Sequence, residues 1–151
     1  MRLGLLACLL TAIVGCAPPP LEQPEPSIRI TFPPTNVEGL TVCPSFVVVT
    51  EIDGFTLVPG DVDEAPDPAR GHWHLYEGDV YQSSVSVNWT RHAVASTSLP
   101  MNLRIEARLA EVNHNETGVK ATAEFMVDDA PGCVGGDPAG AQDTGDTADG
   151  T

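Results

Sequence analysis

Basic residues are scarce in this chain. Lys and Arg together number 7 against 21 Asp and Glu over 151 residues, so the formal net charge at pH 7 is −14. Such an acidic chain excludes electrostatic binding to nucleic acid and to anionic membrane surfaces, because both carry the same sign of charge. The charge is compatible with cation binding, although the need for solubility alone also explains an acidic surface.

The motifs of common enzyme classes are also missing. The sequence has no Gly-x-Ser-x-Gly, no P-loop, no dinucleotide glycine pattern and no His-Glu-x-x-His. Its acid pairs, Asp61/Asp63 and Asp128/Asp129, fall in predicted loops, whereas general acid–base catalysis needs a carboxylate held in a shaped, partly dry pocket. We therefore expect no catalytic residue and no enzyme activity.

Long apolar runs are absent except at the N-terminus, and that run is too short to cross a bilayer. After Arg2, residues 3–14 are apolar at all but three positions, whereas a spanning helix needs about 20 apolar residues. A charged start, an apolar run and small residues at its end form the pattern of a secretory signal peptide. We expect residues 1–15 to be that signal peptide, removed on export.

The end of this run, Ile13-Val14-Gly15-Cys16, resembles the lipobox of bacterial lipoproteins. In that family the cysteine becomes the first mature residue and is diacylglyceryl-modified and N-acylated. The resemblance implies a lipid on Cys16, and Ala17 in place of Asp after it implies the outer membrane. Two acyl chains already give stable anchoring, so the lipid would hold the protein on either face of that membrane without a spanning helix.

A proline-rich linker and an acidic tail flank a single small domain. Five of the ten residues 17–26 are proline, which favours an extended polyproline II chain, so residues 16–26 are expected to form a lipidated linker. Residues 135–151 contain four Asp and no aromatic, Val, Ile or Leu, which is too little apolar surface for a core. We expect a disordered acidic tail over 134–151 and a folded domain over 27–133.

Cysteines are few, and two of the four remain after export and lipidation. Cys8 leaves with the signal peptide and Cys16 takes the lipid, which leaves Cys43 and Cys133. In an exported, oxidising compartment such a pair is expected to form a disulfide. Two free thiols, or half of a metal site, are the alternatives, although neither cysteine lies in a Cys-x-x-Cys motif.

Helical periodicity is almost absent, and alternation of apolar and polar residues is common. In segments such as Met101–Leu109, apolar residues occupy every second position and polar or charged residues the others. The loop 59–71 has three Pro and four acids and is expected to be exposed. The pattern predicts an all-β fold, an immunoglobulin-like antiparallel sandwich of about seven strands. The predicted strands cover 27–32, 45–52, 54–58, 72–76, 84–89, 101–109 and 119–127.

The most specific interior motif is the segment 71–76, Gly-His-Trp-His-Leu-Tyr. On a strand, His72 and His74 lie on the same face, so their imidazoles can converge on one zinc or copper ion. A third ligand is needed, and His114 is the best candidate, with His92 the next. The alternative is that these histidines are structural, each hydrogen bonded to a carbonyl or hydroxyl group.

The same region resembles a group of small exported bacterial β-domains with a Gly-His-x-His strand. The matching segments are Gly71 to Tyr76, Leu109 to His114 and Ala121 to Val127. That group has no established activity, so the resemblance implies a β-sandwich with metal contact and nothing more specific.

These observations lead to two expectations for function. The first is a lipid-anchored envelope protein that displays a non-catalytic binding or structural module toward an unknown protein or glycan partner. The alternative is an envelope protein that binds copper or zinc through His72, His74 and His114. Metal titration distinguishes them.

Overall fold

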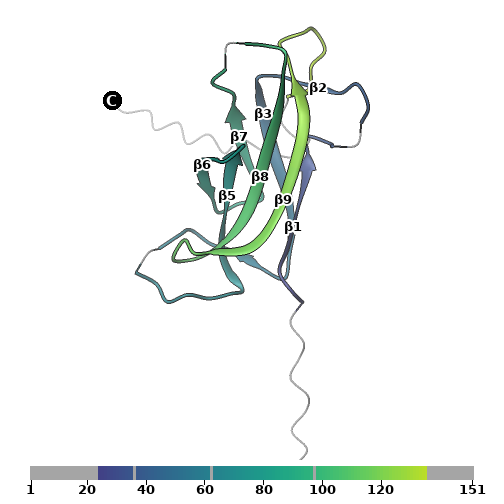
Figure 1. Ribbon diagram of the computed structural model, residues 1–151. Coiled ribbons are helices and arrows are strands. Elements are labelled where there is room, and N and C mark those ends of the chain that lie inside the picture. The colour runs from purple at the N-terminus through teal and green to yellow at the C-terminus, as the bar shows by residue number, and fades with distance from the viewer. Residues whose placement is uncertain (1–23, 36, 62, 97, 136–151) are drawn as a thin grey trace, which may run out of the picture.

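The computed structural model describes residues 24–135 except 36, 62 and 97. This part of the chain is all-β, as predicted, and it forms nine strands (Figure 1). The strands are β1 (Ser27–Phe32), β2 (Thr41–Val42), β3 (Ser45–Asp53), β4 (Thr56–Leu57), β5 (Arg70–Glu77), β6 (Val80–Val85), β7 (Trp89–Ala93), β8 (Met101–Glu111) and β9 (Glu116–Val127). The expected signal peptide, Cys16, most of the linker and residues 136–151 of the expected tail lie outside the described residues.

The strands form two sheets that enclose one core. The smaller sheet has the order β1-β3-β7, and the larger has the order β2-β9-β8-β5-β4, with β6 also paired to β5. The expectation of a wholly antiparallel sandwich is wrong at two places, since β2 runs parallel to β9 and β4 runs parallel to β5. β8 and β9 are long and curved in Figure 1, so the larger sheet curls. The immunoglobulin-like assignment stays a prediction.

Alternation sets which side chains enter the core. On β5, Trp73 and Leu75 are buried between the sheets, and on β8 the same holds for Ile105 and Leu109. These are the faces that the sequence pattern predicts. Phe46 of the smaller sheet packs edge-to-face against an aromatic ring of the larger sheet, with ring centroids 5.3 Å apart. The core therefore joins the two sheets along the length of the long strands.

One strand prediction is wrong in detail. The segment 84–89 is not one strand, because β6 ends at Val85 and β7 begins at Trp89. Between them the chain passes from the larger sheet to the smaller one, and Val87 is exposed where the pattern places it inside. The carbonyl of Val87 instead accepts a hydrogen bond of 2.7 Å from the indole N–H of Trp73. This crossing, together with the two-residue strand β2, accounts for nine strands in place of seven.

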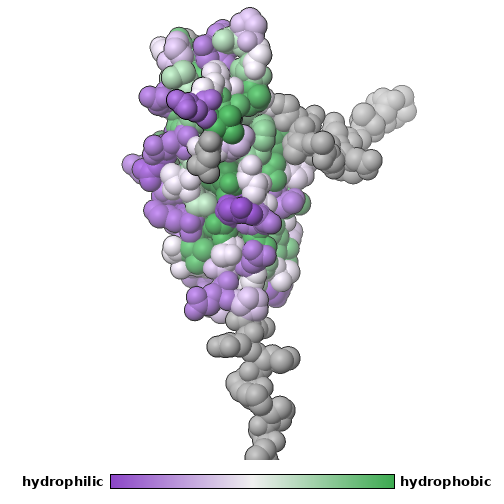
Figure 2. Space-filling view, turned by 90° about the vertical axis from the view of Figure 1, so that its right-hand side faces the viewer, coloured by the Kyte–Doolittle hydropathy of each residue, from purple (hydrophilic) through white to green (hydrophobic). Residues whose placement is uncertain are grey.

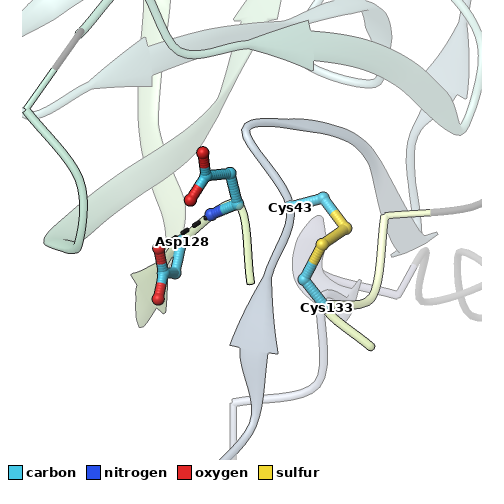
Figure 3. The surroundings of a disulfide bond; sticks show 4 residues. Cys43, Asp128 and Cys133 are labelled. Atoms are coloured by element: carbon cyan, nitrogen blue, oxygen red, sulfur yellow. Dashed lines mark hydrogen bonds between the residues drawn. A yellow bond between two sulfur atoms is a disulfide. The ribbon is translucent and has the colours of Figure 1, made fainter. Parts of the chain in front are cut away.

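The expected disulfide joins Cys43 to Cys133, residues 90 apart in the chain, with their Cα atoms 5.0 Å apart (Figure 3). Backbone hydrogen bonds support the link, because Val134 accepts from the N–H of Cys43 and donates to Thr41. Val134 also forms a bridge with Val42. Ordered structure thus continues past residue 133, so the expected disordered tail does not begin at 134.

The N-terminal part of the described chain lies at the opposite end of the domain from β2. Pro24 and Pro26 line one shallow hollow together with Gly54 and Pro68. Figure 1 shows the chain entering at the end where the β4–β5 loop and the β8–β9 turn also lie. Hydrophilic and apolar residues are interspersed over the face seen in Figure 2. Within the described residues, no helix is long and apolar enough to span a membrane.

Candidate metal centre

β5 brings two histidines to the outer face of the larger sheet. Because side chains alternate along a strand, Trp73 points into the core while His72 and His74 point away from it. The neighbouring strand β8 places Ala110 opposite His72 and Arg108 opposite His74. The Gly-His-x-His motif therefore presents two imidazoles side by side on a rigid, central strand.

His114 reaches the same face from the turn between β8 and β9. Its N–H donates to the carbonyl of Glu111 (2.9 Å), and the N–H of Glu111 donates to the carbonyl of Asn115 (2.8 Å). The φ angle of His114 is 69°, a left-handed conformation that costs a non-glycine residue about 1 kcal/mol or more and is concentrated at functional sites. The turn thus holds His114 over β5 at some cost in backbone energy.

The three imidazoles converge through one nitrogen each. Nε2 of His72 lies 3.0 Å from Nε2 of His74 and 3.0 Å from Nδ1 of His114, and the remaining pair of nitrogens is 3.4 Å apart. Two of the three side chains are buried, and that of His114 is exposed. Zinc–nitrogen bonds of about 2.0–2.1 Å in tetrahedral geometry separate the nitrogens by about 3.3 Å. The observed spacing therefore suits a single ion bound by all three rings.

Hydrogen bonding alone cannot satisfy all three contacts between these nitrogens. Each contact needs an N–H on one ring and a lone pair on the other. Among three nitrogens that all neighbour one another, two must carry the same group, so one contact always opposes two donors or two lone pairs. A cation that accepts one lone pair from each ring removes this conflict, since neutral imidazole is a good ligand for zinc and copper.

The electrostatics keep the buried histidines neutral. Burial, together with the neighbouring His114 and His74, lowers the pKa of His72 to about 4. Burial also lowers the pKa of His74, although the Glu116 carboxylate opposes that shift. A neutral imidazole has a free lone pair, so at neutral pH both rings are in the form that binds a metal ion.

A carboxylate lies behind His74, on the side away from the cluster. The pairing of β8 with β9 shifts register between Arg108 and Ala110, which places Glu116 opposite Ala110. Oε1 of Glu116 is 3.6 Å from Nδ1 of His74. The same oxygen accepts a 2.5 Å hydrogen bond from the Tyr76 hydroxyl, and Oε2 accepts one of 3.2 Å from Arg108. Glu116 is therefore held from two sides while it faces the second nitrogen of a candidate ligand.

This carboxylate is ionised. Burial by itself raises the pKa of Glu116, but the hydrogen bonds from Tyr76 and Arg108, and the charge of Arg108, outweigh it and lower the pKa below its ordinary value. The guanidinium carbon of Arg108 also lies 4.0 Å from the centre of the Tyr76 ring. The group behind His74 is thus a negative charge with fixed neighbours.

The β4–β5 loop covers the cluster at Gly60. A Cβ atom added at Gly60 would lie 2.5 Å from Nε2 of His114 and 2.8 Å from Cε1 of His72. The loop is fixed there, because the N–H of Asp61 donates to the carbonyl of Val112 (2.8 Å). Residues 59–61 are exposed, as predicted for this loop, yet glycine at position 60 is what lets the backbone approach the imidazoles so closely.

Replacing Gly60 with Ala is expected to weaken zinc binding by about tenfold or more, since overpacking costs about 1–3 kcal/mol. In the metal-free protein the exposed His114 ring can move aside and leave only the contact with His72, but in the metal-bound protein both rings are fixed. The effect should therefore appear in the zinc affinity, measured by chelator competition, more than in the melting temperature without metal. The neighbouring change Pro59→Ala is the control. Equal zinc affinities for the two variants would contradict this role for Gly60.

The structure brings together the predicted ligands His72, His74 and His114. The other candidate for the third ligand, His92, lies elsewhere. His92 lies on β7 of the smaller sheet, where it is buried and its Nε2 is 3.0 Å from Oε2 of Glu77. This contact links the two sheets. The only group of three or more metal-ligating side chains found among the described residues is the three-histidine cluster.

Two residues of the site do not stand out in the sequence. Glu116 follows His114 by two positions, but only the register shift between β8 and β9 turns it toward His74. Gly60 is one glycine in a loop rich in proline and acid, and the close approach that requires it is tertiary. Alternation of residues predicts the face of a strand, but it carries no signal for a shift of register or for a loop that folds over that face.

Comparisons with known proteins add no relatives. The chain matches no protein-family model, no curated protein and no solved structure.

Proposed function

We propose that this protein binds a zinc or copper ion through His72, His74 and His114. The observation that carries the proposal is the set of three ring nitrogens separated by 3.0, 3.0 and 3.4 Å. That spacing suits an ion, and hydrogen bonds alone leave one of the contacts unsatisfied. Two of the rings are neutral through burial, which favours metal binding further.

The number of ligands bears on the role of the ion. Structural zinc sites use four protein ligands, whereas sites with three leave a position for water or another ligand. Three candidate side chains meet here within the described residues, and one of them, His114, is exposed. This supports a site that takes up and releases its ion, or that offers it to an outside ligand, over a purely structural zinc.

The test is a titration of the purified protein, free of any histidine tag, with Zn²⁺ and with Cu²⁺ in the presence of a competing chelator. We expect one ion per chain. Failure of both ions to compete with a weak chelator would overturn the proposal, and the histidines would then be structural. A role as a non-catalytic binding or structural module without metal stays a prediction, as does the lack of enzyme activity.

We further propose that the protein is exported and anchored by a lipid on Cys16. The support is the sequence: a charged start, an apolar run of about a dozen residues and the ending Ile13-Val14-Gly15-Cys16. Intact-mass analysis of protein from its native host should give a chain that begins at residue 16 and carries acyl groups. Unacylated protein, or a chain that keeps residues 1–15, would contradict this.

A further inference from the structure

We propose that Glu116 is a positioning residue of the metal centre, which holds the proton of His74 on Nδ1 so that the lone pair of Nε2 faces the ion. The inference rests on the proposed metal binding, but its first test needs no metal. It assigns a task to a residue that donates no ligand atom to the three-histidine cluster.

The first step in the argument is the orientation of His74. Its Nε2 lies 3.0 Å from His72 and 3.4 Å from His114, so Nε2 is the nitrogen that faces the ion. Nδ1 must then carry the proton. Nδ1 of His74 is buried and makes no hydrogen bond with the described residues, and a buried donor without an acceptor costs about 1–3 kcal/mol.

The second step is the placement of the acceptor. Oε1 of Glu116 lies 3.6 Å from that Nδ1, which a movement of about half an ångström would bring within the usual range of hydrogen bonds. Metal-binding histidines commonly donate their other N–H to a carboxylate, which fixes both the tautomer and the ring. Glu116 stands where such a partner is needed.

The third step is the rigidity of Glu116 itself. The hydroxyl of Tyr76 and the guanidinium of Arg108 each hold one of its oxygens. Tyr76 comes from β5, the strand of His72 and His74, and Arg108 lies opposite His74 on β8. The register shift that brings Glu116 to this point is an irregularity in the pairing of β8 with β9, and such irregularities often re-aim a side chain beside a functional site. Three strands thus fix one carboxylate behind one imidazole.

The test compares Glu116→Gln and Glu116→Ala with Glu124→Gln, a change on the same strand at a side chain that is 75% exposed. Long-range ¹⁵N NMR of the metal-free protein reports which nitrogen of His74 carries the proton. We expect the Nδ1–H form in the parent protein and in Glu124→Gln, and a shift toward the Nε2–H form in both Glu116 variants. Zinc affinity should fall about 10–100-fold in the Glu116 variants and stay unchanged in Glu124→Gln.

A further variant keeps the proposal testable if Glu116→Ala does not fold. Tyr76→Phe removes one of the two hydrogen bonds that hold the carboxylate, so it should give an intermediate loss of zinc affinity. An unchanged His74 tautomer in folded Glu116→Gln, or an affinity equal to that of Glu124→Gln, would overturn the proposal. If the parent protein binds no zinc, the proposed function fails, but the tautomer measurement still decides whether Glu116 orients His74.

Discussion

Replacing His74 with Gln is expected to lower zinc affinity more than about 100-fold, because loss of an outer-shell partner of a ligand already costs about 10–100-fold. His114→Asn should have a comparable effect. Asn tolerates the left-handed backbone that His114 adopts, so this change removes the ligand without straining the turn. Both losses are measured by competition with a chelator of known affinity.

The loss of zinc binding in these two variants can also be measured through the melting temperature. An ion present at 100 times its Kd stabilises the folded state by about 2.7 kcal/mol, and each kcal/mol raises the melting temperature of a domain of this size by about 4 °C. Zinc should therefore raise the melting temperature of the parent protein by about 10 °C and leave those of the two variants nearly unchanged.

The chain supplies its own control for these variants. His92 is also buried, but it lies on β7 of the smaller sheet, where it contacts Glu77 and not the three-histidine cluster. His92→Gln should lower stability and leave zinc affinity as it is. If all three substitutions reduced affinity equally, the loss would report general loosening of the fold, and the three-histidine centre would lose its support.

Removing the Cys43–Cys133 disulfide is expected to reduce the free energy of unfolding by about 4–5 kcal/mol, which is the loop-entropy value for a crosslink across about 90 residues. That is a large part of the stability of a small domain. With a slope of about 1.5 kcal/mol per M, the urea midpoint of the Cys43→Ala/Cys133→Ala double variant should drop by about 3 M.

The same crosslink can be removed from the parent protein by a reducing agent. The reducing agent should lower the urea midpoint of the parent protein toward that of the double variant and have no effect on the double variant. Identical midpoints for the parent protein with and without reductant would show that the crosslink adds no stability. Zinc binding should persist in the folded double variant, since β9 runs about 36 Å from Glu116 at the histidines to Val127 near the disulfide.

The sequence predicts most of the strands because one face of each is buried. Alternation places Trp73, Leu75, Ile105 and Leu109 inside, and all four are buried. The pattern fails between Val85 and Trp89, where the chain leaves one sheet for the other. Apolar residues still alternate there although no continuous strand forms. The pattern therefore does not indicate that the chain passes from the larger sheet to the smaller one.

The site is predictable in part for the same reason. A His-x-His pair on a strand must share a face, so His72 and His74 follow directly from the sequence. His114 is a reasonable third ligand only once the turn that carries it is known to fold back over β5. The parallel pairings of β2 and β4, the register shift at Glu116 and the approach of Gly60 depend on contacts between distant segments, which periodicity does not encode.

The end of the domain at which the described chain begins also holds the β8–β9 turn that carries His114. If Cys16 bears the proposed lipid, the ten-residue linker 17–26 joins the bilayer to this end. The imidazoles would then lie at the end of the domain nearer the bilayer, and the disulfide would lie at the end farther from it. A donor or acceptor of the ion that sits in the same bilayer could then reach the site without passing along the length of the domain.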